Sequence, residues 1–486
     1  MGITEKVSSA SKWSLATQLL SKLMGPITNM FLARLLAPEA FGMVATITMI
    51  TSFSDIFTDA GFQKYLVQQE FKDESDLDDH TNVAFWTNFS LSLLIWAVIF
   101  FFRHPLARAV GNAGLGNSLA VAALAVPLTS FSSIQMARYR RALDFRTLFF
   151  AKMLGILVPL LVTVPLAFLL RSYWALIIGN LCMEAANAIL LTVRSTWKPS
   201  FFYSFEQLKN MFAFSIWTLT EQLLGWANLN IGIFIVGKFL SDYYLGLYKT
   251  SMASGNQIML LLVYALSPVL LSALSRLKEN RTEYDEFFYK FEEIISVIIL
   301  PLGVGVYVYR KLFTLILLGS QWGEAADFIG LWSMLSAMMI VFGYFSMEIF
   351  VSLGKPRYCV LGQLLELLVL VPVLLITAKK GFHTLYVARS LIKLWCICIE
   401  LTLLKKFAQI SPLRILKGSW RYLVVSLLMG VLGYALLRLS ENVIWQVGSV
   451  FICIVFYFGV LYFIPRTRET LLELKKMAVA RKLGPD

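Results

Sequence analysis

The chain has 486 residues, of which 58% are hydrophobic and only 15% are charged. Soluble proteins carry about 25% charged residues, so this composition excludes an ordinary soluble domain. The formal net charge of +13 does not require a nucleic-acid partner, because Lys and Arg collect on the cytoplasmic loops of membrane proteins. We therefore expect a membrane protein that binds no nucleic acid.

Apolar runs of about 20 residues, the length that crosses the hydrocarbon core of a bilayer, recur along the whole chain. They predict an all-α polytopic membrane protein with about 14 transmembrane helices. The predicted spans are 14–36, 40–63, 83–102, 118–138, 148–170, 173–194, 211–237, 244–274, 290–318, 326–352, 358–378, 383–404, 419–438 and 443–464.

The loops between these spans are short, and most Lys and Arg residues fall on one side of the predicted membrane. That side holds the N-terminal tail, loops such as the one containing Arg138, Arg140 and Arg141, and the C-terminal tail. By the positive-inside rule both termini are predicted to be cytoplasmic.

An internal repeat relates residues 13–42 to residues 217–246 at an offset of 204, with eight identities in thirty ungapped positions. Trp13 aligns with Trp217, and Gly42 aligns with Gly246. The offset predicts two six-helix lobes in parallel repeat, 1–200 and 205–408, followed by spans 13–14 in 409–465 and a basic amphipathic cytoplasmic tail, 466–486. Transporters built from parallel repeats hold substrate near the bilayer midplane, between the repeats.

Three charges lie within the first predicted hairpin, namely Lys22, Asp55 and Asp59. A charge at the centre of a membrane helix costs about 3 kcal/mol on insertion scales and usually faces a cavity or pathway. We predict that Lys22 and Lys249 bind an anionic substrate group. Asp55, Asp59 and Glu221 would hold these cations, or bind a coupling H⁺ or Na⁺.

The alternative is a buried structural ion pair, such as Lys22 with Asp55. The repeat argues against a purely structural role, because Trp226, Met259 and Val263 occupy the positions that match Lys22, Asp55 and Asp59. The repeated fold therefore does not require these charges.

Two further cations, Arg389 and Lys393, lie one helical turn apart in the predicted span 383–404. We predict that they also bind substrate, with an ion pair to Glu366 of the preceding span as the alternative. Gly25-Pro26 interrupts the first span and is predicted to be a hinge, although membrane helices are in general richer in both residues.

The chain contains no GxxxxGK[ST] phosphate loop, the motif by which many ATPases hold nucleotide. No arrangement of its three His residues predicts hydrolysis or a metal site. We expect a transporter rather than an enzyme, without a cofactor or metal apart from a coupling H⁺ or Na⁺.

Two motifs, LARLLAPEAFG at 32–42 and DAGFQKYLVQ at 59–68, resemble the oligosaccharide flippases. These form the polysaccharide-transporter branch of the multidrug/oligosaccharidyl-lipid/polysaccharide exporter superfamily. Within that branch the chain is most similar to the lipopolysaccharide and colanic-acid type exporters.

The resemblance implies a V-shaped, two-lobed transporter in the bacterial inner membrane. It would move an undecaprenyl-pyrophosphate-linked oligosaccharide by alternating access, for exopolysaccharide or O-antigen biosynthesis. It would act as a monomer, among membrane lipids and beside a polysaccharide polymerase and chain-length machinery.

Local alignment with the flippases places Lys22 and Asp59 at cavity-lining positions. This sequence has Thr28 and Asn29 where the relatives carry an Arg-Asp pair, so Lys249 or Arg389 would supply the second cationic site. The remaining alternatives are a multidrug/cation antiporter of the same superfamily, a membrane glycosyltransferase or polysaccharide polymerase, and a scaffold that transports nothing.

Overall fold

The computed structural model describes residues 13, 20, 24–59, 61–465 and 467–470. Within that part of the chain the regular structure is entirely helical. The contacts between Cα atoms divide the chain into two compact units, Met1–Lys249 and Thr250–Asp486, here called unit 1 and unit 2. The boundary between the two units falls inside one helix, Asp242–Leu277, whereas the repeat predicts a boundary near residues 200–205. The two six-helix lobes, 1–200 and 205–408, stay a prediction.

Unit 1 begins, in its described part, with a helical segment over residues 24–35. Its further α-helices are α2 (Pro38–Asp59), α3 (Phe62–Gln68), α4 (Glu74–Phe101), α5 (Arg103–Ala109), α6 (Gly116–Ala122), α7 (Ala125–Arg141), α8 (Phe145–Val158), α9 (Val164–Leu170), α10 (Trp174–Arg194), α11 (Phe205–Phe239) and the start of α12 (Asp242–Leu277). A π-helical turn, Pro159–Thr163, joins α8 to α9.

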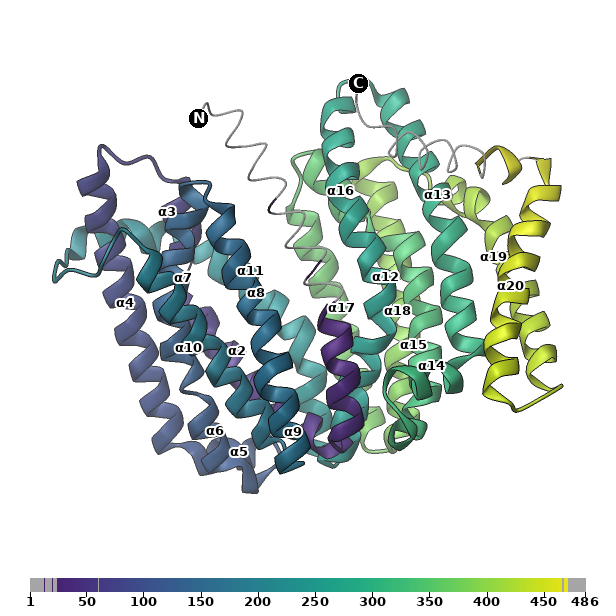
Figure 1. Cartoon of the computed structure of the whole chain (residues 1–486). Coiled ribbons are helices and arrows are strands. Elements are labelled where there is room, and N and C mark those ends of the chain that lie inside the picture. The colour runs from purple at the N-terminus through teal and green to yellow at the C-terminus, as the bar shows by residue number, and fades with distance from the viewer. Residues whose placement is uncertain (1–12, 14–19, 21–23, 60, 466, 471–486) are drawn as a thin grey trace. The chain divides into compact units, whose positions relative to one another are not determined.

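Local sequence explains where several of these helices begin. The side chains of Asp73, Asp144 and Ser204 accept hydrogen bonds from backbone N–H groups in the first turns of α4, α8 and α11, which satisfies donors that a helix leaves unpaired. In the packed unit, α7 lies between α4 and α10, and α2 contacts α4, α7 and α11 (Figure 1). This arrangement brings α2, α7, α8 and α10 around one interior space.

Unit 2 contains the rest of α12 and the helices α13 (Arg281–Val308), α14 (Arg310–Leu317), α15 (Ala326–Met339), α16 (Ser346–Ser352), α17 (Arg357–Ala378), α18 (Phe382–Leu403), α19 (Pro412–Leu437) and α20 (Val443–Phe463). Helix α13 packs on α15 and α19, α18 packs on α15 and α17, and α20 packs on α19 (Figure 1). A continuous apolar core runs through this unit, with Phe288, Phe345 and Phe350 almost fully buried in it.

Ten helices in the described residues are long and apolar enough to cross a membrane. They agree with ten of the predicted spans. The other four predictions fall on the partly described first segment and on α11, α12 and α18, all of which are helical where described. The prediction of an all-α polytopic membrane protein is confirmed, while the count of 14 spans stays a prediction.

Candidate transport cavity

Helix α2 carries two chemically different faces. Thr48, Thr51, Ser52 and Asp55 follow the i, i+3, i+4, i+7 spacing of one helix face and line two pockets whose walls contain polar side chains. Ile50, Phe53, Ser54 and Phe57 follow the same spacing on another face and line an apolar groove. A single membrane helix therefore separates a polar space from an apolar one within unit 1.

The polar space consists of three adjoining pockets of about 740, 250 and 240 Å³, together called the polar cavity. Leu32, Pro159 and Met183 line both the first and the second pocket, and Thr129 lines both the first and the third. Most of the walls come from residues 25–32 and from α2, α7, α8 and α10. The π-helical turn Pro159–Thr163 and single residues of α3, α6 and α11 complete them. Lining a cavity at membrane depth with polar side chains is costly unless the cavity serves water or a polar ligand.

Charged groups lie along the largest pocket of the polar cavity. Arg140, near the α7–α8 turn, lines it together with Lys152 of α8 and Glu184 of α10. Lys152 interacts electrostatically with Glu184. Asn187, one turn beyond Glu184 on α10, also lines the pocket, and its side-chain oxygen is buried without a hydrogen-bond partner in the described structure. The described walls of this pocket therefore present two cations, one carboxylate and two amides, Asn29 and Asn187, to whatever enters it.

The third pocket contains Asp55 in a ring of hydroxyl and amide side chains, namely Ser52, Gln63, Thr129, Ser130, Ser133 and Gln222. Arg140 donates a hydrogen bond to Gln63 at 3.1 Å, which joins this pocket to the basic end of the largest one. Trp226 of α11 donates to Ser52 at 3.1 Å, and its ring lies against that of Phe53 with centroids 4.7 Å apart and the planes tilted by 54°. Trp226, which the repeat aligns with Lys22, thus packs against the polar face of α2.

The other predicted residues of unit 1 are placed only in part. Gly25 lines the largest pocket, Pro26 lies in the same helical segment, and Lys249 is half-buried in α12, three residues after Gly246. Lys22 lies outside the described residues, and so do the side chains of Asp59 and Glu221, whose backbones belong to α2 and α11. The roles predicted for all six residues stay predictions.

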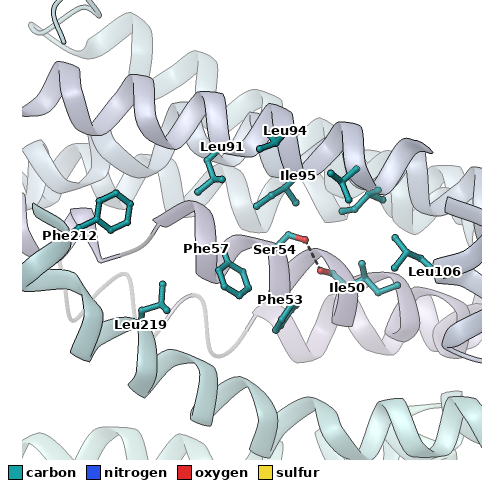
Figure 2. Close-up of a pocket in the computed structure, with 12 residues that line it drawn as sticks. Ile50, Phe53, Ser54, Phe57, Leu91, Leu94, Ile95, Leu106, Phe212 and Leu219 are labelled. Carbon is teal, nitrogen blue, oxygen red and sulfur yellow. Dashed lines mark hydrogen bonds between the residues drawn. The ribbon is translucent and has the colours of Figure 1, made fainter. Parts of the chain in front are cut away.

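The apolar groove of about 630 Å³ lies among α2, α4 and α11. Figure 2 shows Phe53 and Phe57 of α2 facing it together with Leu91 and Ile95 of α4 and Leu219 of α11. Among the described residues that line it, Ser54 alone is polar, and the Ser54 hydroxyl donates to the Ile50 carbonyl at 3.0 Å. With that hydroxyl satisfied, the described walls of the groove offer hydrocarbon surface. Unit 2 has a second apolar groove of about 430 Å³, formed by α13, α14, α19 and α20.

The two predicted cations of unit 2 gather over one aromatic ring. Lys393 places its ammonium 3.9 Å from the Trp332 ring centroid, and the Arg389 guanidinium lies 5.2 Å from it. Arg389 also pairs with Glu366 at 3.7 Å, as the alternative prediction had it. Trp332 is held in turn by a 3.0 Å hydrogen bond from its indole N–H to Asn256. Two cations therefore face one carboxylate and one ring inside the unit.

Sequence reasoning missed Lys152, Arg140 and Asn187 as cavity residues and left Glu184 without a role. One signal was available, because Lys152 and Glu184 both fall inside predicted spans, where a charge is rare. Their partnership could not be read from the chain, since it depends on how α8 packs against α10.

These features define the class of the protein: a polytopic helical membrane protein whose unit 1 encloses a cavity with polar and charged side chains in its walls. The model of the family described as "Polysaccharide biosynthesis protein" matches residues 31–327, which is more than half of the chain. The chain belongs to this family.

Curated relatives and solved structures agree with this assignment. The chain is 23% identical over 308 residues to the succinoglycan biosynthesis transport protein ExoT of Rhizobium meliloti (strain 1021), covering 63% of this chain and 61% of ExoT. It is 20% identical over 326 residues to the lipopolysaccharide biosynthesis protein WzxC of Escherichia coli (strain K12), covering 67% of this chain and 65% of WzxC.

Among solved structures, the lipid II flippase MurJ in an inward closed conformation superposes with a TM-score of 0.74 at 13% identity, covering 93% of this chain and 98% of MurJ. An inward-facing multidrug resistance transporter of the MATE family and the MOP superfamily gives a TM-score of 0.62, also at 13% identity, covering 83% of this chain and 94% of the transporter. These likenesses show the fold, which flippases and drug transporters share. The predicted family and fold class are thereby confirmed.

Proposed function

We propose that the chain is a flippase that moves a polyprenyl-pyrophosphate-linked oligosaccharide across the bacterial inner membrane, with both termini in the cytoplasm. The oligosaccharide would be a repeat unit of a surface polysaccharide, such as an exopolysaccharide or O-antigen. Family membership and the named relatives support polysaccharide biosynthesis as the process.

The observation that carries the proposal is the polar cavity of unit 1. Its polar walls would replace the water around a hydrated sugar, and its cations Arg140 and Lys152 would attract a phosphate. Lys22, Lys249, Arg389 and Lys393 would add further positive charge along the path. The isoprenoid tail would stay in hydrocarbon, for which the grooves of unit 1 and unit 2 offer apolar surfaces.

A transporter of this kind would work by alternating access, exposing the substrate site to each side in turn. Without a nucleotide site in the sequence, an H⁺ or Na⁺ gradient would supply the energy. A monomer would suffice for this cycle, and a polysaccharide polymerase and chain-length machinery would take over the product.

The test uses a strain that lacks the gene and carries either the wild-type chain or Lys22→Ala. Wild type should restore surface polysaccharide, and Lys22→Ala should reach the membrane at normal levels while export stops and the lipid-linked oligosaccharide accumulates on the inner leaflet. Lys72→Ala, which changes an exposed residue between α3 and α4, is the matched control. If lipid-linked oligosaccharide does not accumulate in the deletion strain, the proposed function is wrong.

The multidrug antiporter remains the second candidate because the MATE fold is the same. It predicts that deletion changes drug susceptibility and leaves surface polysaccharide unchanged. Two cations around Trp332 disfavour a cationic substrate in that part of unit 2.

A further inference from the structure

The apolar groove of unit 1 runs lengthwise along its helices. Leu91 and Ile99 of α4 both line it, and their separation of eight residues corresponds to about 12 Å of helix rise. The lining continues beyond this stretch, to Phe212 of α11 at one end and to Leu106 of α5 at the other (Figure 2). Since α2 and α4 are both long enough to cross the membrane, the groove follows the direction in which they cross it. Its shape therefore suits an extended chain.

The groove is also open to the surroundings of the helices. Leu94 and Val98 of α4 are 60% and 48% exposed, and both line the groove. None of its described lining residues carries a charge, and the Ser54 hydroxyl is already hydrogen-bonded within α2. At membrane depth the open side of such a groove faces hydrocarbon, so a chain can enter it sideways from the bilayer. A hydrocarbon chain is the ligand that these walls fit.

The same two helices, α2 and α11, border both the groove and the polar cavity. On α11, Leu219 lines the groove, whereas Gln222, less than one turn further along, lines the third pocket of the polar cavity. On α2, Phe53 lines the groove and the adjacent Ser52 lines that pocket. Trp226 of α11 contacts both sides, because it donates to Ser52 and its ring lies against Phe53. The line of contact between these two helices, here called the α2–α11 seam, thus separates the groove from the polar cavity.

A lipid whose headgroup enters the membrane fits this pair of sites better than an ordinary phospholipid does. A helix with its side chains is only about 10–12 Å across, so the head and the tail of one molecule can lie on the two sides of α2. Thr48 lines the polar cavity and lies in the middle of the span Pro38–Phe57. A phospholipid keeps its headgroup at the bilayer surface, about 15 Å away from that level. A lipid-linked sugar in transit, by contrast, brings its headgroup there.

We propose that the apolar groove of unit 1 binds the isoprenoid tail of the transported lipid while the headgroup occupies the polar cavity, so that the molecule crosses the α2–α11 seam. The assignment rests on the proposed function and deepens it, because it selects the groove of unit 1 over the groove of unit 2 as the tail site. Leu94 and Val98, at the open side of the groove, then recognise the tail and not the sugar.

Tail binding is tested by photolabelling of the full-length protein in phospholipid vesicles. One probe is undecaprenyl phosphate with a diazirine in its tail, and the other is a phospholipid with a diazirine in an acyl chain, each at the same mole fraction. The isoprenoid probe should label the peptides that contain residues 50–57 and 91–99, and unlabelled undecaprenyl phosphate should compete with it. Equal labelling of these peptides by both probes would show that the groove holds any acyl chain and would overturn the assignment. Labelling confined to the groove of unit 2 would overturn it as well.

Two substitutions test the groove itself. Leu94→Trp and Val98→Trp place a large ring in the groove at exposed positions, so the fold should tolerate them. Each should lower the labelling of residues 50–57, which neither substitution changes, by roughly tenfold. Leu93→Trp is the matched control and should be labelled as wild type is, because Leu93 is an exposed residue of the same helix outside the described lining. Unchanged labelling of both groove variants would overturn the assignment, and the comparison of the two probes on wild type keeps the test decisive even if a variant fails to fold.

Surface polysaccharide export in the deletion strain separates the tail site from the proposed function. Leu94→Trp should lower export by roughly tenfold at normal membrane levels of the protein, while Leu93→Trp should export normally. Normal export by Leu94→Trp, in a strain where the wild-type chain restores export, would contradict the tail site and leave the flippase function standing. Failure of the wild-type chain to restore export would contradict the proposed function instead, and the photolabelling would still decide whether the groove selects an isoprenoid chain.

Discussion

Gly42 of α2 and Gly246 of α12 pack against each other's helix in a reciprocal manner. A Cβ atom on Gly42 would overlap the carbonyl of Asp242, and a Cβ atom on Gly246 would overlap the carbonyl of Pro38. The offset of 204 that relates Gly42 to Gly246 also relates Pro38 to Asp242. The two halves of the internal repeat therefore cross through equivalent atoms, as expected for two elements related by a local two-fold axis.

This crossing predicts that Gly42→Ala and Gly246→Ala each destabilise the protein. Backbone atoms cannot move aside as a flexible side chain would, so overpacking should cost about 1–3 kcal/mol. Thermal unfolding of the detergent-solubilised protein measures the effect. Gly225→Ala is the control, because a Cβ atom there meets nothing within 4 Å. Equal melting temperatures for Gly42→Ala and Gly225→Ala would show that the crossing is not tight.

Much of this architecture follows from the sequence, for physical reasons that particular residues illustrate. The predicted span 148–170 appears as α8, the π-helical turn and α9, 145–170, because apolar length alone decides whether a segment crosses a membrane. The predicted span 290–318 is less simple. Tyr309 leaves the helical conformation between α13 and α14 (φ −94°, ψ 23°), and hydropathy does not respond to such a break.

The interior sites were less predictable, because they depend on packing between distant segments. One polar helix face could have been predicted from the sequence alone, because helical spacing relates Thr48, Thr51, Ser52 and Asp55. By contrast, Lys152 and Glu184 lie on different helices, and only the packing of α8 on α10 brings them to the same pocket. Glu292 lies close to the predicted start of a span, where a carboxylate would ordinarily reach water, and only the fold buries it.

Arg389 and Glu366 should be energetically coupled. Arg389 is buried while Glu366 is half-buried, and removing the Glu366 carboxylate leaves the buried guanidinium without its ion-pair partner. We expect Arg389→Met and Glu366→Gln each to lower the unfolding midpoint, with a double-mutant coupling energy of about 0.5–3 kcal/mol. Lys380→Gln, exposed in the α17–α18 turn, should have no effect. Strictly additive single effects would show that the pair contributes nothing to stability.

Asp242 predicts a pH dependence of stability. Burial raises the pKa of Asp242 above its ordinary value of 3.8, Glu39 raises it further, and a hydrogen bond from Asn112 opposes the rise. The folded state therefore binds the proton more tightly than the unfolded state does, so the stability contributed by this group is complete below about pH 4 and is lost as pH rises through the folded-state pKa.

The substitution Asp242→Asn should remove this dependence. Its melting temperature should exceed that of wild type at neutral pH and should match it in acid, when both are followed by intrinsic fluorescence in detergent. The effect should be small, since Asp242 is half-exposed and solvent screens its charge. The opposite result would contradict the assigned direction of the pKa shift. In that case the wild-type melting temperature would rise between about pH 4 and about pH 7, and the melting temperature of Asp242→Asn would rise less over the same range.

Lys152 and Glu184 test whether the polar cavity of unit 1 carries substrate. If Lys152 attracts a phosphate, Lys152→Met should reduce export by roughly tenfold or more, because an ion-paired hydrogen bond contributes about 1.5–3 kcal/mol. The variant should fold normally, since this lysine is exposed to the cavity rather than enclosed in the core.

Glu184→Gln distinguishes a substrate site from a structural pair. It removes a carboxylate that interacts electrostatically with Lys152, so substrate affinity should rise in reconstituted vesicles. A pair that served only the fold would instead give equal losses of stability for both variants and no change in affinity. Arg146→Gln, exposed near the start of the same helix as Lys152, controls for a loss of basic charge outside the cavity and should export at the wild-type rate.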